Sequence, residues 1–441
     1  MALKGMQIIA SEFCASRNRG FAAVNPATGD LLEPRFSEAS SEDINSAVQA
    51  AADSFDQYRM LPIEQRATFL EDIGSQLTAC ASELIARSQA ETALAESRLE
   101  GELTRTVNQL KLFASTVRRG CFVAARIERG RPERQPLPKP DIRSMLVPLG
   151  PVAVFGAGNF PLAFSVAGGD TASALAAGCP VVFKGHPAHP GACELAARAI
   201  VKAIRKNGIP PGVFSLLHAE GTDEGATLVT HPMIRAVAFT GSLSGGRALY
   251  DLGCSRPEPI PVFAEMGSIN PVFILPGALG ERGGQIAEEF ETSALMGTGQ
   301  FCTNPGIVVL QEGEEAEQFI AEMQGRFEKA NPTPLLGFGG LKSLGESVSA
   351  LQSAGATLIA GGSKAEGSGC RFQNTLLRTT GEAFLRDPER LQTEAFGNSN
   401  LFVVARDGEE LERMAASFEG NLTGCIYSDT GGADDELYVR V

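Results

Sequence analysis

The sequence contains no stretch of eighteen consecutive apolar residues, although 43% of its 441 residues are hydrophobic. That absence excludes a transmembrane helix of ordinary length. The first twenty residues hold only a brief apolar run, which is too short for the core of a signal peptide. Charged residues make up 20% of the chain, as is usual for soluble globular proteins. We therefore expect a cytoplasmic protein.

Cysteine and histidine are too sparsely placed to indicate a disulfide scaffold or a metal centre. The nine cysteines are odd in number, widely scattered and without any CxxC pair. Only four histidines occur, and the close pair His186 and His189 has no carboxylate beside it in the loop. We expect no bound metal, and a reducing compartment.

An excess of basic charge is also absent. The formal net charge is -14 at pH 7, which argues against a nucleic-acid-binding surface. We therefore expect neither a nucleic acid nor a membrane as a partner. At 441 residues the chain is too long for one compact core, so we expect two or three domains.

The first 148 residues predict a hairpin, a helical layer and a proline-rich segment. Residues 20–36 alternate loosely around turn signals at Asn25-Pro26 and Thr28-Gly29, which is typical of a β-hairpin. Serine and acidic residues from position 40 onward open a helical pattern that runs to about residue 117. Residues 128–148 crowd prolines among charges, which no helix tolerates. That segment is either an extended linker or an arm that pairs with a partner subunit.

From residue 149 onward, short apolar strands alternate with helical segments. The strands read "VAVFG", "PVVFK", "GVFSLL" and "AVAFTGS", and a small-residue helix over 160–178 ends at Gly178. Such alternation predicts a parallel sheet with right-handed crossovers. The pattern restarts at Pro259 with "PVFAEMGSINPVFIL", which indicates a second α/β domain.

The turn "GAGNFP" follows the first of these strands. It departs from the dinucleotide fingerprint GxGxxG because Pro161 stands at the third glycine, which normally allows close packing of helix on strand. Pro161 instead suits the first turn of a helix. Asn159 either caps that helix or presents its amide as an oxyanion donor, and local sequence alone favours the cap.

Two later strand ends carry features of a nucleotide site. Lys184 ends a strand at the edge where open α/β sheets bind ligands, and no acidic residue follows it until Glu194. Lys184, His186 and His189 stand where an NAD site usually has an acid, which favours NADP. In "FTGSLSGG", Gly241-Ser242 opens a helix whose backbone N–H groups suit a phosphate, although a plain turn uses the same residues.

Glu265 and Cys302 are the candidate reactive groups of the second half. Glu265 follows an apolar strand, where burial raises the pKa of a carboxyl group and suits it to act as a general base. A helix cap or a surface ion pair fits the same position equally well. Cys302, in "GQFCTNPG", lies on an irregular turn that suits a reactive group. Free cysteines are usually buried, however, so the turn alone leaves a structural thiol as the alternative.

Six strings occur in order along nearly the whole chain: "FGAGNFP", "VVFKGHP", "FTGS", "AEMGS", "GQFCTNPG" and "TEAFG". In this order and spacing they resemble the aldehyde dehydrogenase superfamily. The strings "HPAHPG" and "AEMGSINPVF" are most similar to its NADP-dependent 2-oxoglutarate-semialdehyde (2,5-dioxovalerate) dehydrogenase branch.

The resemblance implies an α/β fold with two Rossmann-like open parallel-sheet domains and a protruding oligomerisation arm. It places the cofactor-binding domain at residues 1–127 and 149–258, the arm at 128–148 and the catalytic domain at 259–441. It implies a small-molecule aldehyde substrate and a homodimer or homotetramer completed by the arm.

The resemblance also implies residue roles. Cys302 is the nucleophile, the Asn159 amide and the Cys302 backbone N–H hold the oxyanion, and Glu265 activates the water that hydrolyses the thioester. The cofactor is NADP, with NAD as the alternative. The positions that match its binding residues are Phe155, Lys184, His186, Gly221, Gly225, Gly241, Ser242, Gly246, Gly267, Glu394 and Phe396.

The chain departs from the family pattern in several places. Gly158 stands where many members carry Trp, Pro187 replaces an acid, and Ala395 replaces a branched residue. Members of the family continue for some tens of residues beyond a chain of this length, so we expect their C-terminal tail to be missing. The expected reaction is oxidation of 2,5-dioxopentanoate to 2-oxoglutarate. The alternatives are an aliphatic aldehyde substrate, a non-catalytic cofactor-binding remnant, and a cysteine hydrolase.

Overall fold

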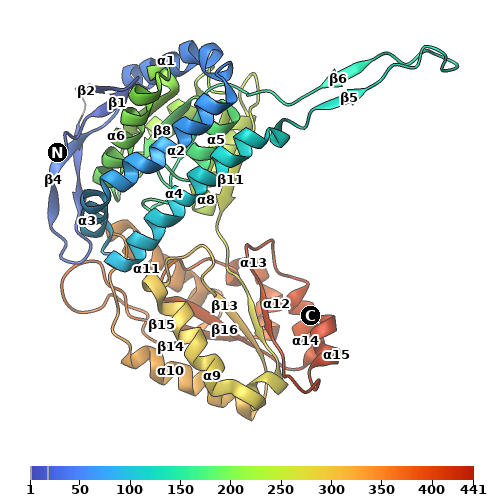
Figure 1. The fold of residues 1–441 in the computed structure, drawn as a ribbon. Helices are drawn as coiled ribbons and strands as arrows, with labels where there is room; N and C mark the ends of the chain where they lie inside the picture. Colours follow the sequence, from blue (N-terminus) through green and yellow to red (C-terminus); the bar gives the residue numbers. More distant parts are fainter. Residues whose placement is uncertain (1, 17–18) are drawn as a thin grey trace. The chain divides into compact units, whose positions relative to one another are not determined.

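A computed structural model describes residues 2–16 and 19–441, and the chain divides into two compact units (Figure 1). The first unit comprises Met1–Ala23 and Leu31–Met266. The second comprises Val24–Asp30 and Gly267–Val441. Both are α/β units built on an open, mostly parallel sheet, as the alternation of strands and helices predicts.

The first unit is built around a seven-stranded sheet in the order β11-β10-β7-β8-β9-β1-β2. Its five leading strands are parallel, and β1 pairs antiparallel to β9. Their apolar runs are continuous because helices cover both faces. The strands are β1 (Gln7–Ile9), β2 (Glu12–Cys14), β7 (Val152–Phe155), β8 (Val181–Gly185), β9 (Phe214–His218), β10 (Ala236–Gly241) and β11 (Val262–Met266).

Eight α-helices are described in this unit. The first begins at a capping box in which the Ser40 and Asp43 side chains each accept a bond from the other's backbone N–H, as the serine-acid start predicts. The helices are α1 (Ser41–Arg59), α2 (Ile63–Ala79), α3 (Ala81–Thr92), α4 (Glu96–Arg119), α5 (Gly169–Ala177), α6 (Pro190–Asn207), α7 (Asp223–Thr230) and α8 (Leu243–Cys254). The expected N-terminal hairpin is β3 (Gly20–Val24) with β4 (Leu31–Ser37).

The proline-rich segment forms a second hairpin. Strands β5 (Arg126–Glu128) and β6 (Ile142–Ser144) pair antiparallel, and a bridge between Arg131 and Lys139 continues the pairing. All residues of both strands are exposed, and the hairpin extends away from the helices of its own unit (Figure 1). Of the two sequence interpretations, an arm fits this geometry and a featureless linker does not.

The second unit has a six-stranded sheet in the order β14-β15-β16-β13-β12-β17. All neighbours are parallel except β14 and β15. Along β13, Ile307 and Val309 pack into one core cluster while Val308 and Leu310 pack into another, so the sheet is buried on both faces. The strands are β12 (Val272–Ile274), β13 (Ile307–Gln311), β14 (Thr357–Ala360), β15 (Thr375–Thr380), β16 (Ser399–Ala405) and β17 (Cys425–Tyr427).

Helices surround this second sheet. The longest, α9, carries a kink at Arg282, where the backbone leaves helical geometry. The helices are α9 (Pro276–Leu295), α10 (Glu314–Lys329), α11 (Phe338–Ser353), α12 (Gly381–Arg386), α13 (Pro388–Leu391), α14 (Gly408–Ala415) and α15 (Asp435–Arg440). Within the described residues, no helix is both long and apolar enough to cross a membrane.

Two boundaries differ from those expected. Strand β11 pairs with β10 in the first sheet, so the first unit ends at Met266 and not at Glu258. The sequence obscured this because only a short turn separates β11 from the next apolar strand. The helix expected over 160–178 begins only at Gly169, although it ends at Gly178 as predicted. Before it, the Glu102 carboxylate accepts hydrogen bonds from the Leu162 and Ala163 N–H groups and holds the segment in a turn.

Candidate active site

The carboxyl ends of four parallel strands in the first unit carry most of its candidate residues. Phe155 on β7 lies in register with Lys184 on β8, and Thr240 on β10 lies in register with Glu265 on β11. Residues in register on parallel neighbours share one end and one face of the sheet. The candidates for cofactor binding and for the general base therefore converge on the edge where open α/β sheets bind ligands.

Lys184 is half-buried at this edge. Burial lowers the pKa of its ammonium group, and the nearby Glu224 and Glu38 carboxylates oppose that shift. Glu194, the first acid after Lys184 in sequence, is occupied elsewhere. Its buried carboxylate accepts bonds from the Lys4 and Gly5 N–H groups at 2.9 Å. It therefore cannot serve as the ribose-binding acid of an NAD site without breaking those bonds.

The two histidines after Lys184 have different surroundings. His186 is half-buried, and its Nδ1 accepts a bond from the Ala188 N–H at 3.2 Å. His189 is fully buried, stacked on His186 with ring centroids 5.2 Å apart. The grouping of His189 with Lys184 as a phosphate ligand is therefore wrong, because its ring is enclosed and both its nitrogens are used inside the unit. His186 stays a candidate.

His189 belongs to a directional chain of buried hydrogen bonds. Its Nε2 lies 3.0 Å from the Ala157 carbonyl, which can only accept, so Nε2 carries the proton. Nδ1 then accepts from the Cys193 thiol at 3.4 Å, and the Cys193 sulfur accepts from the Ser165 hydroxyl at 3.7 Å. Burial lowers the pKa of His189 and raises that of Cys193 to about 12, so both remain neutral. The chain ties α6 to the segment that carries Asn159.

Asn159 is half-buried on that segment and precedes a single turn, not a helix. The cap favoured by local sequence is therefore wrong, because α5 begins ten residues later at Gly169. The Asn159 carbonyl accepts from Arg98 on α4 at 3.0 Å. Arg98 also lies 3.7 Å from Glu102 and 4.6 Å from the Phe160 ring centroid. Two side chains of α4 thus fix the backbone on each side of Phe160.

Gly158 leaves the space that the His186 ring occupies. A Cβ atom placed on Gly158 would lie 2.7 Å from Cε1 of His186, which is closer than real Cβ contacts. A tryptophan at this position would therefore meet the histidine. The departure from the family pattern at residue 158 has its physical cause in the loop after β8.

Two glycines expected to bind the cofactor pack closely against side chains at the ends of strands. A Cβ on Gly225 would lie 3.2 Å from the Phe155 ring, and one on Gly246 would lie 2.2 Å from Met266. Ser242 caps α8, since its hydroxyl accepts from the Gly245 N–H at 3.2 Å. Gly241 ends β10 immediately before this cap. The exposed Gly221 lies just before α7. At the α8 start, the Ser242 side chain and carbonyl already accept from the Gly245 and Gly246 N–H groups.

Glu265 has an acidic neighbour that the sequence did not indicate. Burial raises the pKa of Glu265, and the charge of Asp170 raises it further. Asp170 lies in the first turn of α5, where burial raises its own pKa and its Oδ2 lies 3.5 Å from the Thr240 hydroxyl. Because Thr240 is in register with Glu265, the two carboxyl groups face the same side of the sheet. No local motif links residues this far apart in sequence.

In the second unit, Cys302 lies half-buried on a turn between the 3₁₀ segment Met296–Gly299 and β13. The preceding residues Gly297, Thr298 and Gly299 all have φ between 56° and 66°. Thr298 holds this left-handed conformation through bonds to the Thr333 hydroxyl at 2.6 Å and the Pro334 carbonyl at 3.0 Å. A non-glycine residue held in this way costs roughly 1–3 kcal/mol, a strain that concentrates at functional sites. Cys302 is thus less buried than Cys193 and Cys370, whose side chains are fully buried.

Asn270 clamps the turn that carries Cys302. Its Nδ2 donates to the Cys302 carbonyl at 2.9 Å and to the Asn304 carbonyl at 2.8 Å. Its Oδ1 accepts from Ser268 at 2.7 Å, so the buried amide is fully used. Asn421 fixes the Asn270 backbone by accepting from its N–H at 3.0 Å. Sequence reasoning missed both asparagines because their partners are distant in the chain.

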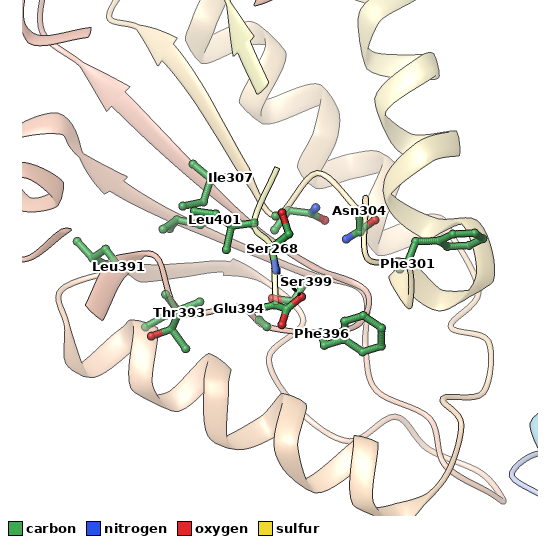
Figure 2. Close-up of a pocket in the computed structure, with 16 residues that line it drawn as sticks. Ser268, Phe301, Asn304, Ile307, Leu391, Thr393, Glu394, Phe396, Ser399 and Leu401 are labelled. Atoms are coloured by element: carbon green, nitrogen blue, oxygen red, sulfur yellow. Dashed lines mark hydrogen bonds between the residues drawn. The ribbon is translucent and has the colours of Figure 1, made fainter. Parts of the chain in front are cut away.

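A pocket next to this turn contains Glu394 and Phe396 (Figure 2). The Glu394 carboxylate accepts from the Ser268 N–H at 3.3 Å. The cavity in this pocket has a volume of about 20 Å³, which is large enough for one water molecule but not for an aldehyde. Gly267, which precedes Ser268, has φ +47°, a conformation that suits glycine. Across residues 2–16 and 19–441, no group of three His, Cys, Asp or Glu side chains is placed to hold a metal ion.

Residues 13–434 of the chain match a family model described as "Aldehyde dehydrogenase family". The chain is 44% identical over 441 residues to alpha-ketoglutaric semialdehyde dehydrogenase 2 of Azospirillum brasilense, covering 100% of this chain and 83% of that protein. It is 41% identical over 426 residues to alpha-ketoglutaric semialdehyde dehydrogenase of Acinetobacter baylyi, covering 96% and 80%. Among solved structures, betaine aldehyde dehydrogenase of Staphylococcus aureus in complex with NAD+ has a TM-score of 0.83 at 19% identity, covering 99% and 85%.

These matches define the chain as an oxidoreductase that acts on aldehydes. It belongs to the aldehyde dehydrogenase family, whose members use NAD or NADP. The branch expected from "HPAHPG" and "AEMGSINPVF" is also confirmed, because both relatives above are semialdehyde dehydrogenases of the same kind.

Proposed function

We propose that this protein oxidises 2,5-dioxopentanoate to 2-oxoglutarate with NADP. The observation that carries the proposal is identity above 40% over almost the whole chain to two alpha-ketoglutaric semialdehyde dehydrogenases. The candidate residues at the sheet edge and on the Cys302 turn are the groups that such a reaction requires.

In the proposed mechanism the Cys302 thiolate attacks the aldehyde carbon and forms a thiohemiacetal. The Asn159 amide and the Cys302 backbone N–H donate hydrogen bonds to the oxyanion, each worth about 10²–10³ in rate. When bound, the nicotinamide would supply the hydride acceptor that this oxidation requires, and the thiohemiacetal on Cys302 would become a thioester. Glu265 then takes a proton from water, the hydroxide adds to the thioester carbon, and the Cys302 thiolate leaves.

The first unit has features that fit a dinucleotide. We propose that Gly241, Ser242 and Gly246 at the start of α8 bind the pyrophosphate, since the start of a helix attracts anions. Gly221, Gly225 and Phe155 would bind the adenosine half. In the second unit, Gly267, Glu394 and Phe396 would hold the nicotinamide ribose.

The NADP preference rests on the loop after β8. Lys184 and His186 supply donors there, and Glu194 is already bonded to the Lys4 and Gly5 N–H groups. A 2′-phosphate suits cationic donors, whereas a ribose 2′-hydroxyl suits a free carboxylate. We therefore expect a lower dissociation constant for NADP than for NAD. The reverse order would contradict this cofactor assignment while leaving the reaction class unaffected.

A single assay tests the reaction. NADPH formation is measured with 2,5-dioxopentanoate, hexanal and dodecanal, for the wild type and for Cys302→Ala. We expect the highest kcat/KM with 2,5-dioxopentanoate and none above background for the variant. Faster turnover of dodecanal would contradict the substrate proposal. Intact NADP binding without any turnover would indicate a non-catalytic remnant.

A further inference from the structure

Arg105 places a guanidinium group beside the segment that carries Asn159. The side chain is exposed on α4, and its guanidinium carbon lies 5.8 Å from the Phe160 ring centroid and 4.9 Å from that of Phe164. The two rings pack edge to face, with centroids 5.0 Å apart. Arg105 therefore rests on an aromatic platform that begins one residue after Asn159.

Arg105 forms no ion pair on its own helix. Its neighbours one turn away on α4 are Gly101, Glu102, Asn108 and Gln109, of which only Glu102 is acidic. Glu102 is turned inward, where its Oε1 accepts from the Leu162 and Ala163 N–H groups at 2.8 and 2.9 Å. Among the described residues, no ion pair includes Arg105.

Two other arginines of α4 have carboxylate partners, as is usual for arginines with a structural role. Arg118 is paired with Glu64 and Glu71 at 2.7 and 2.5 Å. Arg98 lies 3.7 Å from Glu102 and donates to the Asn159 carbonyl. Both charges are compensated within the unit. Arg105, by contrast, rests on the Phe160 and Phe164 rings without such a pair.

We propose that Arg105 binds the terminal carboxylate of the substrate, so that the enzyme selects ω-oxo-carboxylates over uncharged aldehydes. The inference rests on the proposed function, in which Asn159 holds the aldehyde oxygen. A planar guanidinium forms two parallel hydrogen bonds with a carboxylate. Contact with the Phe160 and Phe164 rings holds the exposed Arg105 group next to the segment that carries Asn159. An uncharged alkyl chain would gain nothing from this group.

The test compares kcat/KM for 2,5-dioxopentanoate, 5-oxopentanoate and pentanal. The last two have the same chain length and differ in a terminal carboxylate against a methyl group. The variants are Arg105→Met, Arg105→Lys and, as a matched control, Lys111→Met, which removes an exposed cation from the same helix. Thermal unfolding of each variant checks that the fold is retained.

For Arg105→Met we expect kcat/KM to fall about 10- to 100-fold for both carboxylate substrates, mainly through KM, because a hydrogen bond to a charged group is lost. Pentanal should change less than about twofold, Arg105→Lys should restore part of the loss, and Lys111→Met should resemble the wild type. An equal fall for pentanal, or no fall for 5-oxopentanoate, would overturn the assignment. If the wild type itself shows no preference for carboxylate substrates, the proposed function fails independently of Arg105.

Discussion

At the scale of single residues, the candidate chemistry depends on groups whose surroundings differ sharply from their sequence context. Glu265 was expected to have a raised pKa because it follows an apolar strand, and burial does raise it. The second cause, the charge of Asp170, comes from a helix 95 residues earlier in the chain and follows only from the fold. Two carboxyl groups on one face of a sheet disfavour simultaneous ionisation.

Replacing Glu265 with Gln should separate the two halves of the reaction. Thioester formation does not need the base, so the variant should still release a burst of NADPH close to one per active site. Steady-state turnover should fall by about 10²- to 10⁴-fold, which is the usual contribution of a general base. Rapid-mixing absorbance measures both phases. A variant that loses the burst as well would contradict the assignment of Glu265 to hydrolysis.

The acidic limb of the kcat profile should depend on Asp170. Glu265 acts as a base only when ionised, so turnover falls as pH drops through its raised pKa. The Asp170→Asn variant removes a negative neighbour, which lowers the pKa of Glu265 and moves this limb to lower pH. A pH series of kcat for both proteins measures the shift. An unmoved or alkaline-shifted limb would show that the two carboxyl groups are not coupled.

At the scale of elements, most helices and strands were predictable from the local sequence pattern. The long-range hydrogen bonds that hold the site residues in place were not. The continuous apolar strands, the Gly178 helix stop and the β3–β4 hairpin follow from neighbouring residues. The positions of Cys302 and Lys184 follow from ordered motifs. By contrast, the Asn270 amide holds carbonyls 32 and 34 residues away, and the Glu102 carboxylate holds N–H groups 60 and 61 residues away. Contacts of this kind exist only after packing.

The buried chain through His189 gives an element-scale prediction for the Asn159 segment. In His189→Gln a side-chain N–H can still reach the Ala157 carbonyl, whereas His189→Leu leaves that carbonyl unpaired. An unsatisfied buried acceptor costs about 1–3 kcal/mol. We expect Leu to lower kcat and the unfolding midpoint more than Gln does. Equal effects of the two substitutions would contradict a role for the Nε2 hydrogen bond.

At the scale of the whole molecule, the hairpin of β5 and β6 is the feature that calls for a partner. Ile127, Leu137 and Ile142 are each at least 47% exposed, and the hairpin has little packing against its own unit. Exposed apolar side chains on a projecting strand pair are typical of an interface between subunits. The sequence indicated this segment through its prolines but left its structure open.

We therefore expect a homodimer or homotetramer whose assembly depends on the hairpin. The double variant Ile127→Asp/Ile142→Asp should shift the sedimentation coefficient towards that of a monomer. An Arg129→Asp change immediately after β5 provides a control for altered charge without loss of apolar surface. An unchanged sedimentation profile for the double variant would place the interface elsewhere on the protein.

The close fit of His186 against Gly158 couples the two positions sterically. A tryptophan at 158 and a histidine at 186 cannot share the same space, since even a Cβ at 158 comes within 2.7 Å of the ring. A larger residue at 158 therefore requires a smaller residue at 186 or a movement of the His186 ring. The two positions are sterically coupled, so Gly158→Trp alone should be more harmful than the same change combined with His186→Gly.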